Sequence, residues 1–178
     1  MNKCSGFTLI EVLVAMLVLA FGLLGLAGVQ VISLKNNLSS YNRSQATLLA
    51  NDLVDRIRSN VYDKATYTSI VPSNAHAKEN CLKTNGCTGV EMAENDLYEW
   101  NCSVAGVCER NMPPIATTLP NGQGIVCLDG TPYDGVSAAS LDSAMCDGVG
   151  SAYVIKIWWD DNRSGAASQR FVVSFQLL

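Results

Sequence analysis

The sequence predicts an α+β protein: a long N-terminal helix, with a membrane half and an amphipathic half, packs on a small C-terminal antiparallel β-sheet head with disulfides. Three observations predict this fold class. Residues 7–32 are apolar almost without interruption, a stripe of apolar residues at helical spacing follows, and the C-terminal segment alternates apolar and polar residues. The expected organisation is a short leading segment at 1–6, a transmembrane helix at 7–32, its amphipathic continuation at 33–60 and a globular head at 61–178.

The apolar run from Phe7 to Ile32 is long enough to cross a membrane. As a helix it extends about 39 Å, and the hydrocarbon layer of a bilayer is ~30 Å thick. Glu11 is the one charged residue in the run, and a carboxylate in a membrane helix costs up to roughly 2.5–3.5 kcal/mol on insertion scales. The nearest basic side chains, Lys3 and Lys35, lie outside the run. Glu11 therefore needs a counter-ion from elsewhere.

A cut after Gly6 would supply that counter-ion. It would convert the amide of Phe7 into a free amine four residues ahead of Glu11. The new ammonium can pair with Glu11 of its own helix at i,i+4 spacing, or with Glu11 of a neighbouring helix. A secretory signal peptide places its cleavage site after the apolar core, whereas this site precedes the core. Cys4 also precedes the run, which disfavours lipoprotein processing.

The segment GFTLIEVLVA at residues 6–15 resembles the cleavage and assembly signature of class III signal peptides. Type IV prepilins and the pseudopilins of type II secretion carry this signature. The resemblance implies that residues 1–6 are a leader peptide, which prepilin peptidase removes after Gly6. It also implies N-methylation of the Phe7 amine and a role for Glu11 in docking into a helical filament. The alternative is an ordinary membrane anchor in which Glu11 is incidental.

Further segments are similar to the PilV family of type IV pilus minor pilins. They are LLGLAGVQ at 23–30, RSQATLLANDLVDRIRSN at 43–60, DLYEW at 96–100, LPNGQG at 119–124 and WWDD at 158–161. The resemblance implies a type IV pilin-like fold and a minor pilin that takes part in pilus assembly, initiation or a tip complex. Major pilins usually carry a proline about where Gly28 stands, and its absence here favours a minor component. The cysteine-rich stretch at 70–90 has no counterpart in the resemblance.

The same resemblance implies partners and a location. The partners are other minor pilins, the major pilin, prepilin peptidase and the inner-membrane assembly platform. The chain would first be a single-pass protein of a bacterial inner membrane with a periplasmic head, and then part of a pilus on the cell surface. A minor pseudopilin of type II secretion, or a displayed binding module that acts as an adhesin or DNA receptor, remains the alternative.

Six cysteines remain once the leader and Cys4 are removed. An even number in a small head after a membrane segment indicates three disulfides formed outside the cytoplasm. Sequence order favours the pairs Cys81–Cys87, Cys102–Cys108 and Cys127–Cys146, although fifteen pairings are possible. A zinc site is disfavoured because the first two spacings are C-x5-C and His76 is the only histidine.

The glycines of the apolar run recur every third residue, at Gly22, Gly25 and Gly28. Small residues let helices approach closely in lipid, although each glycine weakens a helix by ~1 kcal/mol relative to alanine. The spacing therefore suits a helix that packs against similar helices. The alternative is a membrane helix that simply tolerates glycine.

The helix is expected to continue past the apolar run, from Phe7 to Asn60 over about 80 Å, because no Pro or Gly occurs from Val29 to Val71. Its second half carries an apolar stripe at Ala46, Leu49, Ala50, Leu53, Val54 and Ile57. A break near Ser39–Ser40 is the alternative.

The head is expected to begin with a loop-rich region at 62–91 and a short helix at 93–100, followed by irregular chain at 111–120. A strand at 124–128 and a hairpin of strands at 153–160 and 170–177 would form the antiparallel sheet, with one face on the long helix and the other partly solvated.

Composition and motifs disfavour an enzyme. The net charge is −4, and it becomes −5 when Lys3 leaves with the leader (12 basic and 16 acidic residues become 11 and 16), so a nucleic acid partner is not expected. One histidine and no phosphate-binding loop leave no catalytic constellation, and neither a cofactor, a metal nor a small-molecule substrate is expected. Asp160–Asn162, or Asp129, Asp134 and Asp142, could form a calcium loop, but turns and solvated loops are the favoured interpretation. Trp158 and Trp159 could stack on bases, but core packing is favoured for at least one of them.

Overall fold

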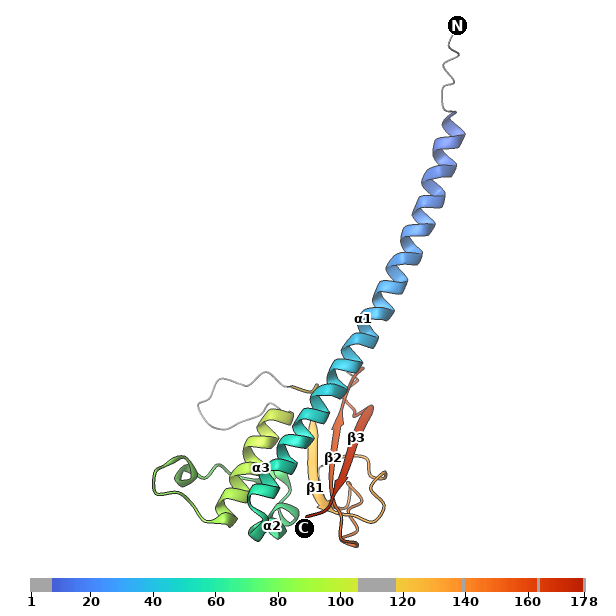
Figure 1. Cartoon of the computed structure of the whole chain (residues 1–178). Helices are drawn as coiled ribbons and strands as arrows, with labels where there is room; N and C mark the ends of the chain where they lie inside the picture. The colour runs from blue at the N-terminus through green and yellow to red at the C-terminus, as the bar shows by residue number, and fades with distance from the viewer. Residues whose placement is uncertain (1–7, 106–117, 139, 163, 178) are drawn as a thin grey trace. The chain divides into compact units, whose positions relative to one another are not determined.

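The computed structural model describes residues 8–105, 118–138, 140–162 and 164–177 (Figure 1). The chain divides into two units, Met1–Ser40 and Tyr41–Leu178. Helix α1 (Leu9–Ser59) contributes to both units without a break at Ser39–Ser40, as its unbroken helical pattern predicts. The predicted Phe7 lies outside the described residues, and the helix ends one residue before the predicted Asn60. There the backbone turns, because Asn60 leaves helical geometry and its carbonyl accepts the amide of Asp63 at 3.2 Å.

The part of α1 in the second unit buries the predicted apolar stripe. The buried residues are Asn42, Ala46, Leu49, Ala50, Leu53, Val54 and Ile57. They recur at three- and four-residue intervals, so they form one face of the helix, which packs into the core of the head.

Short helical segments interrupt the loop-rich region expected at 62–91. They are η1 (Val61–Asp63), α2 (Lys64–Ser69), η2 (Pro72–Asn74) and η3 (Glu79–Leu82). Pro72 begins η2, where its missing N–H costs nothing. The predicted Cys81–Cys87 disulfide closes the following loop, with Cα atoms 4.8 Å apart. Gly86 lies inside that loop at φ +70°, a left-handed conformation that favours glycine.

Helix α3 (Gly89–Ala105) is longer at both ends than the predicted 93–100. Its start is a capping box that the sequence reading missed: Thr88 Oγ1 accepts the amide of Glu91 at 3.3 Å, and Glu91 Oε2 accepts the amide of Thr88 at 2.9 Å. Ala93, Leu97, Trp100 and Val104 form its buried face. The indole Nε1 of Trp100 donates to the carbonyl oxygen of Leu49 at 2.8 Å and thereby links α3 to α1.

The sheet has three antiparallel strands in the order β1 (Gln123–Leu128), β2 (Tyr153–Trp159), β3 (Gln169–Phe175). Each strand lies within two residues of its predicted bounds. Val126, Ile155 and Val173 lie opposite one another in the register and contribute to the core cluster that includes α1 and α3. One face of the sheet therefore covers the helices, as expected (Figure 1).

The second face of the sheet is more covered than expected. Ile125 and Trp158 on this face are buried against Ala138 and Ala144 of the segment between β1 and β2. The predicted disulfide Cys127–Cys146, with Cα atoms 6.0 Å apart, ties that segment to β1. Partial solvation, which was predicted for the whole face, remains at Gln123 at the start of β1 and at Ser174 of β3, which are both exposed.

Candidate functional site

The N-terminal part of α1 presents an apolar surface with one acid in it. The large apolar side chains from Leu9 to Leu34 are exposed, and Glu11 is the one charged residue between them. An 18-residue window of the helix reaches a mean hydropathy of 2.7, so by length and composition the helix can cross a membrane. A helix that is apolar all round needs lipid or other helices around it. This stretch is therefore the candidate site for membrane insertion and assembly.

Glu11 lies in the first turn of α1, and its side chain is exposed. Its amide hydrogen-bonds to the carbonyl oxygen of Thr8 at 3.1 Å. A carboxylate at this end of a helix faces the positive pole of the helix dipole, which partly stabilises it. The predicted cleavage and methylation residues, Gly6 and Phe7, lie outside the described residues, as does Cys4.

The three glycines of the helix have no role within the chain's own packing. A Cβ atom built on Gly22, Gly25 or Gly28 would meet nothing within 4 Å. Glycines whose absent side chains leave open space are available for close approach by another helix. Their spacing is thus consistent with helix–helix packing outside this chain.

A polar network joins α1 to α3 in the head. The Arg56 guanidinium pairs with Asp52 at 3.0 Å, with Asp96 at 3.1 Å and with Glu99 at 3.0 Å. Burial by itself lowers the pKa of Arg56, but the hydrogen bond to Glu99 and the nearby carboxylates outweigh it and raise the pKa above its usual value. Burial and a 2.5 Å hydrogen bond to Asp96 also raise the pKa of Tyr67, so its hydroxyl stays protonated and donates.

A buried lysine lies under the second face of the sheet. Lys156 is fully buried, and its Nζ lies 2.5 Å from Oδ2 of the equally buried Asp129 and 2.7 Å from Oδ1 of Asp134. It also donates to the carbonyl oxygen of Ala144 at 2.7 Å. The hydrogen bond from Lys156 is the main cause that lowers the pKa of Asp134. The ion pair with Asp129 and the hydrogen bonds to Asp134 and Ala144 make this ammonium a structural tie between β2 and the β1–β2 segment.

The candidate calcium loops have other roles. Asp160 is buried, and its carboxylate accepts the amides of Asn162 at 3.0 Å and Gly165 at 2.7 Å, which is turn chemistry. Asp129 and Asp134 are engaged by Lys156. Cys127 and Cys146 lie beside Asp129, and the three residues together could be metal ligands, but the two cysteines are joined in a disulfide. Their sulfur atoms therefore offer no thiolate to a metal.

The remaining predicted residues are placed as follows. Trp158 and Trp159 are both buried, as core packing predicts, which leaves neither free for base stacking. Cys102 is disulfide-bonded, and its predicted partner Cys108 lies outside the described residues. Sequence reasoning missed Lys156 as a site, although a lysine between two apolar residues of a strand, Val154 and Trp158, is a readable signal.

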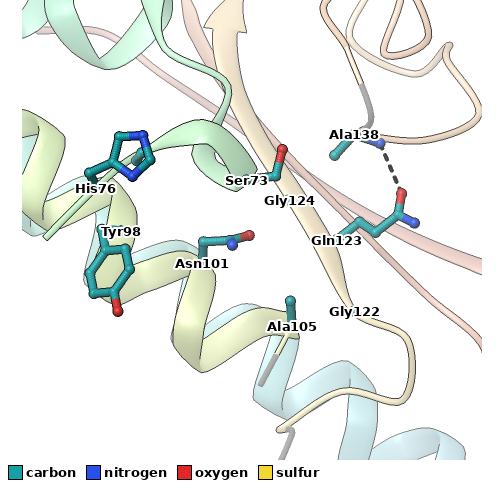
Figure 2. Close-up of a pocket in the computed structure, with 10 residues that line it drawn as sticks. Ser73, His76, Tyr98, Asn101, Ala105, Gly122, Gln123, Gly124 and Ala138 are labelled. Carbon is teal, nitrogen blue, oxygen red and sulfur yellow. Dashed lines mark hydrogen bonds between the residues drawn. The ribbon is translucent and has the colours of Figure 1, made fainter. Parts of the chain in front are cut away.

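The head also contains a pocket of about 520 Å³. Its walls come from the η2 region, from one face of α3 and from the start of β1 (Figure 2). Asn101 lies between His76 and Tyr98 on one side and Gln123 on the other in this view. No motif in the sequence indicated this pocket, because its lining residues are uncharged and scattered along the chain.

Two family models match the chain in adjoining regions. Residues 1–27 match the prokaryotic N-terminal methylation motif, and residues 28–98 match the family described as type IV pilin Tt1218. No curated protein and no solved structure matches the chain. The resemblance to type IV pilins is confirmed over these residues, whereas neither model distinguishes the PilV family. The type IV pilin family is structural and not enzymatic.

Proposed function

We propose that this chain is a minor type IV pilin that prepilin peptidase cuts after Gly6 and that takes part in pilus initiation or a tip complex. The matches of residues 1–27 to the methylation motif and of residues 28–98 to type IV pilin Tt1218 support this proposal. The observation that carries the proposal is Glu11, the one charge between Leu9 and Leu34 on a helix that exposes its apolar side chains. A lone carboxylate in an apolar helix can be stabilised if cleavage after Gly6 creates a Phe7 amine that pairs with it.

The energetics of assembly support this role. A helix that leaves lipid must bury its apolar surface again, and packing among similar helices offers that surface. Inside such a bundle Glu11 would be a charge in a dry setting, which is costly unless it is paired. The ammonium of Phe7 on a neighbouring chain would neutralise it. Gly22, Gly25 and Gly28, where an added Cβ atom would meet nothing within 4 Å, would allow the close approach.

The disulfides support a head that folds outside the cytoplasm. Cys81–Cys87 and Cys127–Cys146 persist in an oxidising compartment such as the bacterial periplasm. With the apolar helix as a single-pass anchor, the head would lie in the periplasm before assembly and on the cell surface afterwards. The proposed partners are the prepilin peptidase, the assembly platform and other pilins, both minor and major.

The assignment as a minor rather than a major pilin, and to the PilV family, rests on the sequence. The PilV-like segments at 43–60 and 96–100 support it, as does the lack of a proline near Gly28. A minor pseudopilin of type II secretion would carry the same N-terminal motif. Affinity capture from native membranes separates the two: pilus-assembly companions support a pilin, and secretion companions support a pseudopilin.

N-terminal mass spectrometry of the protein from its native membranes tests the processing step. We expect a chain that begins at Phe7 and carries one methyl group on its amine. Gly6→Val should leave uncut precursor in the membrane, because the bulkier side chain blocks the cut, while Ser5→Ala should be processed normally. A wild-type chain that still begins at Met1 beside an active prepilin peptidase would refute the proposal.

A further inference from the structure

The pocket in the head has hydrogen-bonding groups without partners. Tyr98 and Asn101 are half-buried, and neither side chain hydrogen-bonds to the described part of the chain. Ser73 and His76 at its rim are exposed, and their side chains also make no hydrogen bond to the described part of the chain. Gln123 uses its Oε1 to accept the amide of Ala138 at 3.2 Å, which leaves its Nε2 free to donate (Figure 2). Half-buried polar groups that lack partners are what a polar ligand satisfies.

The lining also selects the charge of a ligand. None of the described residues that line the pocket is Asp, Glu, Lys or Arg, and the one histidine among them, His76, is exposed at the rim. A phosphate or carboxylate ligand would call for a cationic partner, and an ammonium ligand for an anionic one. Amides and hydroxyls instead both donate and accept, as the hydroxyl groups of a sugar do. The described part of the lining therefore matches an uncharged ligand that is rich in hydroxyl groups.

Size and aromatic content agree with such a ligand. A volume of about 520 Å³ lies within the range of roughly 300–1,000 Å³ that small-molecule sites occupy. The ring of Tyr98 packs against the core at one side and lines the pocket at another. An aromatic ring is an apolar body beside polar groups, which suits the C–H face of a pyranose.

Rigid elements hold the lining in place. Tyr98, Asn101 and Ala105 share one face of α3, whose other face is fixed in the core by the buried Trp100. The wall from β1 includes Gly124, whose backbone lies directly against the Trp100 indole, so that a Cβ atom there would collide with the ring. A site on packed elements keeps its geometry in the absence of a ligand.

We infer that this pocket binds a neutral carbohydrate of one to three sugar units, which would make the head a sugar-binding module. The inference goes beyond the proposed role in assembly. The pocket is formed within the second unit of the chain, so sugar binding and processing after Gly6 can fail independently of each other.

The test uses the full chain in phospholipid nanodiscs, because alkyl-glycoside detergents would themselves present a sugar. The probes are lactose, N,N′-diacetylchitobiose, cellobiose and trehalose, followed by a glycan array, with saturation-transfer NMR as the readout. We expect at least one neutral saccharide to bind, with a Kd of about 1 mM or lower. Tyr98→Ala and Asn101→Ala should each weaken binding about tenfold or more.

Matched controls lie on the exposed surface. Tyr62→Ala and Asn51→Ala remove the same side chains at exposed positions that do not line this pocket, and both should leave the affinity unchanged. If Tyr98→Ala fails to fold, Asn101→Leu keeps the volume of the amide without its hydrogen bonds and should still abolish binding. The inference is overturned if no neutral saccharide binds, if only sialylated or sulfated glycans bind, or if the pocket variants bind as the wild type does.

Discussion

The Nζ atom of Lys156 lies 2.5 Å from Oδ2 of Asp129, and both side chains are fully buried. Lys156 belongs to β2, whereas Asp129 follows β1 directly and begins the segment that covers the second face of the sheet. The pair therefore fixes this segment from inside, while the Cys127–Cys146 disulfide fixes it covalently. A buried charge is costly without its partner, so the stability of the head should depend strongly on this contact.

Lys156→Met should destabilise the head by roughly 3–5 kcal/mol, because it leaves the carboxylate of Asp129 buried without a counter-ion. Denaturant unfolding of the nanodisc-embedded chain, followed by tryptophan fluorescence, measures the effect, since all three tryptophans are buried in the head. Lys83→Met is the control: its pair with Glu79 is exposed at 3.5 Å, so the change should be within about 1 kcal/mol.

The double variant Lys156→Met with Asp129→Asn sharpens this test. It removes both charges, so it should cost less than the sum of the two single changes. Additive losses would show that the two side chains do not interact in the folded protein.

Acid should weaken the contact between Lys156 and Asp134. The hydrogen bond from Lys156 lowers the folded-state pKa of Asp134 below its usual value of 3.8. A carboxyl group with a lowered folded pKa stabilises the fold above its unfolded pKa, and this contribution is lost as the pH falls through the folded pKa. Asp134→Asn should therefore reduce stability at about pH 7 and have a smaller effect near pH 3. Thermal melts of both proteins at the two pH values measure this, and an equal effect at both would contradict the assignment.

Gly124→Ala should destabilise the head by roughly 1–3 kcal/mol, because the new methyl group would collide with the Trp100 indole and overpack the core. Gly25→Ala is the matched control in α1, where a Cβ atom meets nothing within 4 Å and head stability should not change. Tryptophan fluorescence is again the measurement, and it also reports directly on Trp100. An unchanged midpoint for Gly124→Ala would mean that β1 does not approach α3 this closely.

Local patterns in the sequence predicted most of the fold. The apolar stripe of α1 and the alternation of β2 and β3 are periodic, and each period corresponds to a buried face. The extension of α3 to Gly89 was missed, although Thr88 and Glu91 have the spacing of a capping box. The cysteines, prolines and glycines before them led to the prediction of a loop for the whole region.

Contacts between distant residues were beyond sequence reasoning. Arg56 pairs with Asp96, 40 residues away, and Lys156 with Asp129 across two strands. Both depend on the register of packed elements, which periodicity does not supply. The pocket of Asn101 and Gln123 also forms from residues that are distant in the sequence. These residues form no recognisable motif, so the sequence did not indicate the pocket. Glu11 is the opposite case, because its isolation among apolar residues is visible in the sequence.

Glu11→Ala tests whether that isolated acid acts in assembly. The variant should be cut after Gly6 as usual, since the cleavage site is intact, but it should enter filaments poorly. Without the carboxylate, the Phe7 ammonium of a neighbouring chain would be buried unpaired among helices. We expect at least about tenfold fewer copies per sheared filament, which corresponds to ~1.4 kcal/mol. Quantitative mass spectrometry of filaments and membranes measures both pools. Glu79→Ala on the exposed head surface is the control and should be incorporated normally. Normal incorporation of Glu11→Ala would show that the pairing with Phe7 does not drive assembly.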